Sequence, residues 1–199
     1  GHQLSTIEGG MVNTNDKELY EMLLMLRSHG WAKDLPKETY DKMMQAHGID
    51  DFHTPFTFFV PGYNLRSTDL QAFLGIRQVK KAAWVAKSRN KNHELYAKKL
   101  EGCVEFQKWG DNRPVSISFG ALADNTRHRQ EIVTRLVENG IETRIFSAGN
   151  LGLHPFWYDR YGKFRDKVSD KIHANGFFIP NYPELEDSVI DFICKVVRV

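Results

Sequence analysis

The chain has 199 residues, of which 41% are hydrophobic, 12% aromatic and 26% charged, a profile typical of a folded globular protein. Its 27 basic and 25 acidic residues leave a formal charge of +2, and this balance gives no indication of a nucleic-acid-binding protein, which needs a concentrated basic face. No apolar stretch approaches the ~20 residues of a membrane span. The first residues lack the charged and apolar regions of a signal peptide. We therefore expect a cytoplasmic protein that binds neither nucleic acid nor membrane.

The chain contains two cysteines, Cys103 and Cys194. Their separation does not resemble the spacing of metal ligands. The sequence therefore predicts two buried thiols in the reducing cytosol and no metal site.

The first third of the chain predicts one strand and one helix. Residues 9–16 indicate a strand that leaves a glycine turn. Residues 16–30 carry leucines at helical spacing, with Asn15 or Asp16 as the N-cap and Gly30 as the stop.

A long irregular stretch, 31–59, comes next, and connections of this length are usually functional or wrap a partner. After it, a helical pattern capped by Ser67 or Thr68 continues to about Leu100, which is longer than most globular helices. Such a helix often bridges two domains, so we place a domain boundary inside it, between 1–85 and 86–199.

The rest of the chain alternates strand-like and helical patterns, which is typical of a small α/β or α+β layer domain. The predicted order is strands in 103–109 and 114–122, a helix in 125–140, a strand in 141–147, a loop in 148–164, a helix in 165–176, a strand in 177–181 and a closing helix in 183–199.

The segments before Arg66 do not make a domain by themselves. One strand, one helix and a long loop cannot bury a core against each other. We expect either that another chain supplies the missing layers or that the chain is a fragment of a longer one.

Four segments in this order carry a resemblance to a known family: "GHQLSTIEGGMVNTND", "MLRSHGW", "VPGYNLRSTDLQAFLGIRQ" and "IETRIFSAGN". Together they resemble the C-terminal half of the fold-type I PLP enzymes that act on nucleotide-linked keto-sugars, namely the sugar aminotransferases and their dehydratase relatives. The resemblance implies an α/β fold, the C-terminal part of an aspartate aminotransferase-like structure. A small α/β domain would follow a long linking helix, and 1–85 would be the tail of the large PLP-binding domain.

His2 occupies the position that holds the PLP-binding lysine in most of this family. A histidine there resembles the 3-dehydratase subgroup that acts on GDP-4-keto-6-deoxy-hexoses in deoxysugar and O-antigen biosynthesis. Imidazole cannot hold PLP covalently, but it titrates near pH 6.5 and can move protons in both directions. The resemblance implies that glutamate supplies the amino group and that His2 assists loss of the C3 hydroxyl. A tag remnant is the alternative reading of Gly1-His2.

Four further positions match family site residues, and a fifth residue follows from its place beside one of them. Asn64 corresponds to an asparagine that reaches the PLP phosphate of the neighbouring subunit. Arg144 matches an arginine that pairs with the glutamate carboxylate. Side chains repeat every two residues on a strand, so Glu142 points to the same face of the predicted strand and would orient Arg144 or line the sugar site. His29 matches a histidine near the dehydratase active site. Lys33 stands where relatives tend to have an arginine that binds a carboxylate. Structural readings stay open: a loop cap for Asn64, an outward strand residue for Arg144 and a helix-end residue for His29.

The resemblance also implies a homodimer with shared active sites, PLP or pyridoxamine phosphate as cofactor, and a GDP-linked keto-sugar with L-glutamate as substrates. Two cysteines are too few for the Cys₄ iron–sulfur cluster of the related CDP-linked branch, so we expect no metal. The family groups that hold PLP from the other side lie before His2, so the chain alone would be inactive. Two alternatives remain: a sugar aminotransferase, or an inactive dimerisation and substrate-binding fragment.

Overall fold

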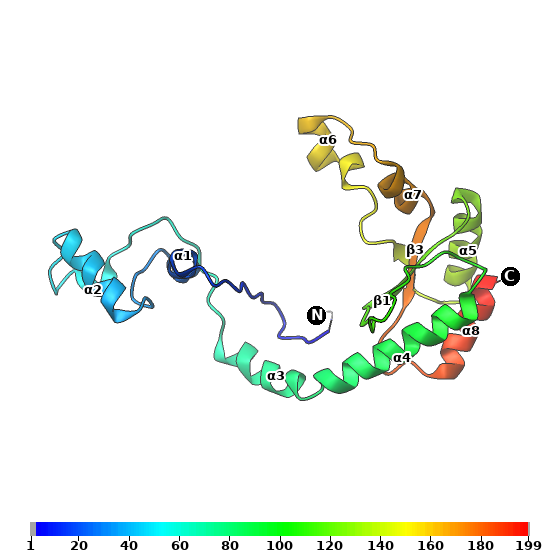
Figure 1. The fold of residues 1–199 in the computed structure, drawn as a ribbon, viewed down its shortest axis with the longest axis horizontal. Coiled ribbons are helices and arrows are strands. Elements are labelled where there is room, and N and C mark those ends of the chain that lie inside the picture. The colour runs from blue at the N-terminus through cyan, green and yellow to red at the C-terminus, as the bar shows by residue number, and fades with distance from the viewer. Residues whose placement is uncertain (1–2, 199) are drawn as a thin grey trace. The chain divides into compact units, whose positions relative to one another are not determined.

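The computed structural model describes residues 3–198, so His2 lies outside the described residues (Figure 1). The described chain forms two compact units, one from Gln3 to Gln78 and one that begins at Val79. The identification of these units with the tail of a large domain and with a small domain stays a prediction.

The first unit contains helix α1 (Lys17–Arg27), helix α2 (Lys37–Ala46), a 3₁₀ turn (Thr54–Phe56) and helix α3 (Asp69–Val79). The predicted first helix is confirmed, because the Asp16 side chain accepts a hydrogen bond from the Leu19 amide at 3.0 Å and caps α1. A small core joins α1, α2 and the chain that follows them. Its buried members are Met25, Ala32, Leu35 and Met44.

Two expectations for this unit are wrong. The stretch 31–59 is not irregular throughout, because α2 forms after Pro36 and carries the ion pairs Lys37–Asp41 and Glu38–Lys42 on its exposed side. Residues 9–16 do not form a strand: none of the other described segments pairs with them, and a strand needs a partner for its backbone hydrogen bonds.

The predicted continuous helix up to Leu100 is also wrong. It is divided into α3 and α4 (Ala82–Leu100), with Lys80 and Lys81 outside both helices. The sequence gives no glycine or proline signal for this break. The two helices belong to different units. Helix α3 has no fully buried residue, whereas α4 buries one side against the rest of the second unit. The break therefore lies where the packing of the chain changes from the first unit to the second.

The second unit is built on a three-stranded antiparallel sheet in the order β1-β3-β2. Its strands are β1 (Ser118–Leu122), β3 (Gly176–Pro180) and β2 (Arg144–Ile145). Phe119 of β1 pairs with Ile179, and Arg144 pairs with Phe178. The predicted strand 103–109 is reduced to a single bridge between Glu105 and Leu122.

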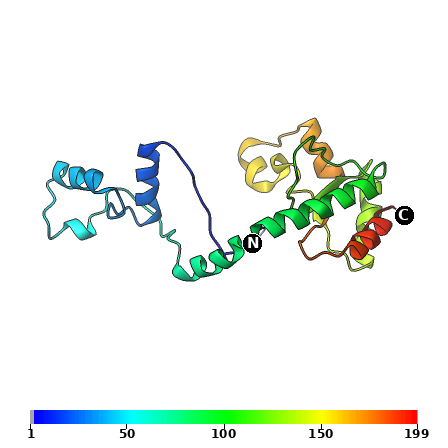
Figure 2. The same cartoon turned by 60° about the horizontal axis from the view of Figure 1, so that its bottom comes forward.

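Five helices accompany this sheet, and α4 and α8 run side by side in both views (Figures 1 and 2). Besides α4 they are α5 (Thr126–Glu138), α6 (Pro155–Tyr161), α7 (Lys167–Asn175) and α8 (Asp187–Arg198). The predictions of α5, α7 and α8 are confirmed. The predicted loop 148–164 is wrong in part, because it contains α6 and a 3₁₀ turn (Leu151–Leu153), with Pro155 opening α6 at its first turn.

The core of the second unit lies between α4, α5, α8 and the sheet. Its largest fully buried side chains are Tyr96, Leu100, Phe119, Ile132, Leu136, Phe177, Ile179, Ile190, Ile193 and Val197. Cys194 is buried in this core and Cys103 is partly buried; both are free thiols, and burial raises the pKa of Cys194 to about 11. No helix in the described part of the chain has the length and apolarity needed to cross a membrane.

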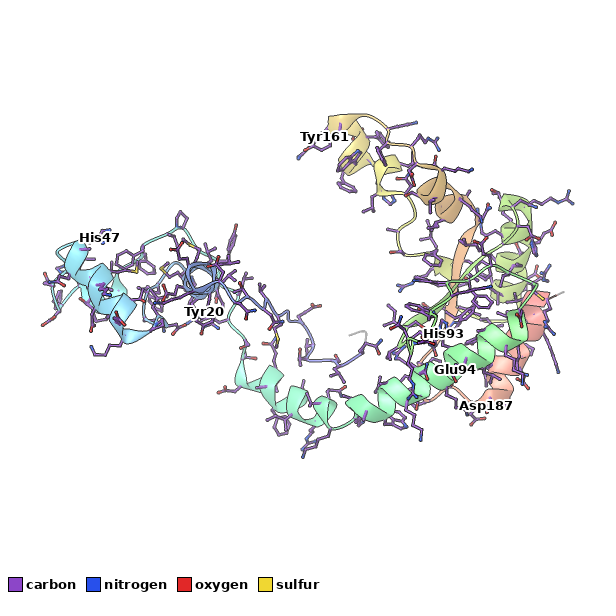
Figure 3. The ribbon with its side chains drawn as sticks, in the orientation of Figure 1. Tyr20, His47, His93, Glu94, Tyr161 and Asp187 are labelled. Atoms are coloured by element: carbon purple, nitrogen blue, oxygen red, sulfur yellow. The ribbon has the colours of Figure 1, made fainter. Side chains whose placement is uncertain are left out.

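A buried polar network joins α4 to the segment just before β1 and to the segment just after β3. Asn181 donates to the Ser116 carbonyl at 2.9 Å and to the Arg89 carbonyl at 3.2 Å. His93, labelled on α4 in Figure 3, contacts Ser116 Oγ through Nδ1 at 3.0 Å, and Trp109 Nε1 donates to its Nε2 at 3.1 Å. Because Nε2 accepts, the neutral Nδ1–H tautomer fits this network.

We expect the stability of the second unit to decrease as the pH falls below about 6.5, the ordinary pKa of histidine. Burial lowers the pKa of His93, with the nearby Glu94 charge opposing the shift. The unfolded chain therefore takes up a proton that the folded chain resists until its own lower pKa is reached. Above pH 6.5 His93 is neutral in both the folded and the unfolded chain, so it no longer lowers the stability of the second unit.

Guanidinium unfolding midpoints between pH 7.5 and 5.5 measure this effect. His93→Gln is the matched control, because a glutamine amide can accept from Trp109 and donate to Ser116 without titrating. The variant should lose less stability than the wild type over this range. Equal losses in the two proteins would contradict the assignment to His93.

Candidate active site

The structure separates the predicted site residues into two groups. His29, Lys33 and Asn64 belong to the first unit, whereas Glu142 and Arg144 belong to the second. His2 lies outside the described residues. Each group is described within its own unit.

The first group is brought together by a crossing of two backbone segments. Bridges pair Ser28 with Asn64 and Trp31 with Phe58, and the His29 amide donates to the Tyr63 carbonyl at 2.7 Å. The segments approach so closely that only glycine fits at the crossing point. A Cβ atom on Gly30, whose φ is +89°, would overlap the Val60 carbonyl oxygen, and one on Gly62 would lie 2.5 Å from the His29 carbonyl carbon.

This crossing places His29 beside Asn64, with Arg66 between them. Arg66 Nε donates to Asn64 Oδ1 at 3.3 Å, and Arg66 Nη2 lies 3.4 Å from His29 Nε2. His29 has φ = 63°, a left-handed conformation that non-glycine residues rarely adopt. Sequence reasoning missed Arg66. Its only sequence signal was a basic residue two positions after Asn64.

Lys33 is linked to the same group through Trp31. Its ammonium nitrogen lies 4.4 Å from the centre of the Trp31 ring, a cation–π distance. His29 meets the Trp31 ring in an edge-to-face arrangement at a centroid distance of 5.9 Å, and Phe58 stacks on this ring at 5.4 Å. A carboxylate-binding role for Lys33 therefore competes with this aromatic contact and stays a prediction.

The donors of this group suit an anion. Asn64 and Arg66 are exposed, and among the described residues the Asn64 amide nitrogen has no acceptor of its own, since the hydrogen bond to Arg66 uses Oδ1. A guanidinium beside an amide N–H₂ group offers several directed donors, the arrangement that binds phosphate or carboxylate oxygens.

In the second unit, Arg144 occupies the short edge strand β2. It is exposed, and its guanidinium carbon lies 5.7 Å from the centre of the Phe178 ring on the neighbouring strand. The ring supports the guanidinium from one side and leaves its N–H groups available to a ligand. Glu142 is exposed and precedes β2, so strand alternation does not apply to it; the ion pairs found in residues 3–198 do not join it to Arg144.

A pocket of about 270 Å³ opens beside β2, between α5 and α7. Two basic side chains that sequence reasoning missed are fixed in it: Arg129 Nε donates to the Ala174 carbonyl at 3.1 Å, and His173 Nδ1 accepts from the Asn150 amide at 3.2 Å. The lining residues are Arg129, Val133, Thr143, Arg144, Ile145, His173, Gly176 and Phe177. In residues 3–198 no three His, Cys, Asp or Glu side chains gather in a way that could hold a metal ion.

A model of the DegT/DnrJ/EryC1/StrS aminotransferase family matches residues 1–198 of this chain. Among curated proteins, the GDP-4-keto-6-deoxy-D-mannose 3-dehydratase of Escherichia coli O55:H7 is 32% identical over 206 residues, which cover 99% of this chain and 52% of that protein. The chain thus spans about half the length of the curated relatives it matches.

Two solved structures of this dehydratase are similar to the chain. The E. coli enzyme with bound hydrated PLP superposes with a TM-score of 0.84 at 27% identity. The aligned region covers 98% of this chain and 51% of the chain of that enzyme. A second structure, with a trapped PLP–glutamate adduct, gives 0.79 at 27% identity and covers 92% and 49%. The chain therefore has the α/β fold of PLP-dependent aminotransferase-like proteins over about half of their length.

Proposed function

Because this chain belongs to the DegT/DnrJ/EryC1/StrS aminotransferase family, we propose that it is part of a PLP-dependent sugar 3-dehydratase. The full-length protein would remove the C3 hydroxyl of a GDP-4-keto-6-deoxy-hexose, with glutamate as amino donor. The observation that carries this proposal is the 32% identity to GDP-4-keto-6-deoxy-D-mannose 3-dehydratase across 99% of the chain. His2, in the position where most of the family has lysine, supports a dehydratase over an aminotransferase.

The residues of the first unit fit a PLP phosphate. Asn64 and Arg66 are exposed, and the hydrogen bond from Arg66 Nε to Asn64 Oδ1 brings the guanidinium next to the amide group. The remaining N–H groups of the two side chains suit phosphate oxygens. When bound, PLP supplies an electron sink for bond breaking at the adjacent carbon. His29, in contact with Arg66 at 3.4 Å, would hold this arginine in place, and the crossing at Gly30 and Gly62 would hold His29.

His2 would act as the acid–base group. A neutral imidazole accepts a proton, and its protonated form can return that proton to the departing C3 hydroxyl group. A lysine in its place would instead bind the cofactor covalently and allow release of an aminated product. The substitution of histidine for lysine therefore favours loss of water over transfer of nitrogen.

Arg144 would bind the glutamate carboxylate. Its planar guanidinium, supported by Phe178, can offer two parallel N–H donors to a carboxylate. Glu142, exposed in the same unit, would orient Arg144 or line the sugar site. Lys33, exposed in the first unit, would bind a carboxylate there. In this proposal Asn64 binds the PLP phosphate of the neighbouring subunit, and Arg144 binds the amino donor.

The direct test incubates the full-length protein with PLP, L-glutamate and GDP-4-keto-6-deoxy-mannose, and measures ammonia release and product mass. We expect one ammonia per sugar and a product that has lost oxygen at C3 and contains no nitrogen. An amino-sugar product without ammonia release would instead establish the aminotransferase.

A homodimer with shared active sites is part of the proposal. The first unit exposes many apolar side chains, and a second copy of the chain would cover part of them in such a homodimer. They include Phe52, Phe56, Phe58, Tyr63, Leu65, Leu70, Phe73 and Ile76. A cytoplasmic location, supported by the two free thiols, belongs to the same proposal.

A further inference from the structure

Helix α3 has one half-buried side, formed by Gln71, Leu74, Gly75 and Gln78, while every other residue of α3 is exposed. The spacing i, i+3, i+4, i+7 places these four residues on a single side of the helix. Something in the first unit therefore covers this side.

The cover is the turn of residues 5–8, in the "STIE" segment that follows His2. The Ser5 amide donates to Gln78 Oε1 at 3.4 Å. A Cβ atom on Gly75 would lie 3.2 Å from Thr6 Cγ2, so the turn touches the helix there. Gln71 Nε2 donates to the Glu8 carbonyl at 2.7 Å.

The backbone of this turn is strained at Ile7. Ile7 has φ = 73°, which is unfavourable for a branched side chain. Within the turn, the Thr6 hydroxyl donates to the Glu8 carbonyl at 3.3 Å and the Ile7 amide to Ser5 Oγ at 3.4 Å. The shortest hydrogen bond on this turn is the one from Gln71, which links it to a helix 63 residues away.

Gln71 is itself fixed by the start of α3. Its side-chain Oε1 atom accepts from the backbone amide of Thr68 at 2.9 Å, and the backbone amide of Gln71 donates to Thr68 Oγ1 at 3.3 Å. These reciprocal bonds form a capping box, which needs a side-chain oxygen at position 71 and works with glutamate or glutamine. The bond to Glu8 also needs an N–H donor, which only glutamine has.

We propose that Gln71 is a positioning residue that holds the turn of residues 5–8 against α3 and so anchors the chain three residues after position 2, where the proposed acid–base residue stands. The inference rests on the proposed function for the role of His2, but the attachment of the turn stands on the contacts alone. A misplacement of about 1 Å at a catalytic group can cost about 100-fold in rate. We therefore expect an effect on kcat rather than on KM.

The test compares two variants of the full-length protein. Gln71→Glu keeps the oxygen of the capping box, removes the donor to Glu8 and brings a negative charge to the Glu8 carbonyl. Thr68→Ala weakens the helix cap but leaves the Gln71–Glu8 bond in place. Hydrogen exchange of the peptide that covers residues 3–10 is measured together with kcat and KM for the GDP-sugar.

We expect Gln71→Glu to accelerate exchange in residues 3–10 and to lower kcat about 10- to 100-fold with KM unchanged, while Thr68→Ala leaves both readouts near wild type. Unchanged exchange in Gln71→Glu would overturn the attachment. Faster exchange with unchanged kcat would overturn the positioning role, and equal effects in both variants would assign the effect to helix stability. If the wild type produces no dehydration, the proposed function fails, and exchange still decides the attachment.

Discussion

Replacing Gly62 with alanine is expected to destabilise the first unit by about 4 kcal/mol or more, the upper end of single-substitution effects. The new Cβ atom would overlap the Gly30 amide nitrogen and lie 2.5 Å from the His29 carbonyl carbon. Both neighbours are backbone atoms in the crossing, so they cannot move aside as a flexible side chain would. The two segments must separate, and His29 then leaves Asn64 and Arg66.

Hydrogen exchange locates this effect. In the wild type, the amides of His29, Phe59, Tyr63 and Leu65 donate across the crossing at 2.7–2.9 Å and should exchange slowly. In Gly62→Ala they should exchange fast, while the amides of α4 and α8 keep their wild-type protection.

Two glycines serve as controls. A Cβ atom on Gly10 would meet nothing within 4 Å, so Gly10→Ala should be near neutral. Gly48 has equally open surroundings but φ = +64°, so Gly48→Ala measures backbone strain alone, about 1 kcal/mol. A Gly62→Ala variant no less stable than Gly48→Ala would show that the crossing is not a steric requirement.

Replacing His2 with lysine in the full-length protein is expected to reduce dehydration by about 100- to 10,000-fold, the usual contribution of acid–base catalysis. It should also create a covalent attachment of PLP, because an unprotonated lysine amine reacts with the cofactor aldehyde and an imidazole does not. Both effects would come from one change of side chain at the position where most of the family has lysine.

Dehydratase turnover and intact mass after borohydride reduction measure the two effects. His2→Asn is the matched control, since an amide can neither move protons at neutral pH nor hold PLP covalently. It should lose turnover and gain no PLP mass. Dehydration at the wild-type rate in His2→Lys would remove His2 from the mechanism. A natural sequence without histidine at position 2 would also remove it, because the histidine would then be a tag remnant.

Local signals were sufficient where a helix begins at its own capping residue. Asp16, Thr68, Asn125 and Asp166 each accept hydrogen bonds from amides two or three positions further along the chain. These contacts involve only neighbours in the sequence. The sequence pointed to Asp16 and Thr68 as caps, each beside one alternative, Asn15 and Ser67, and it predicted the helices that follow Asn125 and Asp166 without naming their caps.

The segment beyond α1 shows the opposite case. Helix α2 lies in a stretch predicted as irregular, and its Met44 is buried only because Met25 and Leu35 pack with it in the same cluster. The break between α3 and α4 likewise follows from the different units in which the helices pack. Apolar periodicity cannot show a change of packing partner in the middle of a helical pattern.

The sequence by itself determined the family motifs and the chemical identity of the candidate residues: an imidazole at position 2, an amide at 64 and a guanidinium at 144. Only the tertiary structure decided that Arg66 lies between Asn64 and His29 and that Gln71 binds the turn after His2. The physical reason is distance along the chain. The contacts of Arg66 with His29 and of Gln71 with Glu8 join residues 37 and 63 positions apart. The first depends on the close approach of two backbones at Gly30 and Gly62, and the second lies beside the contact between Gly75 and the Thr6 side chain.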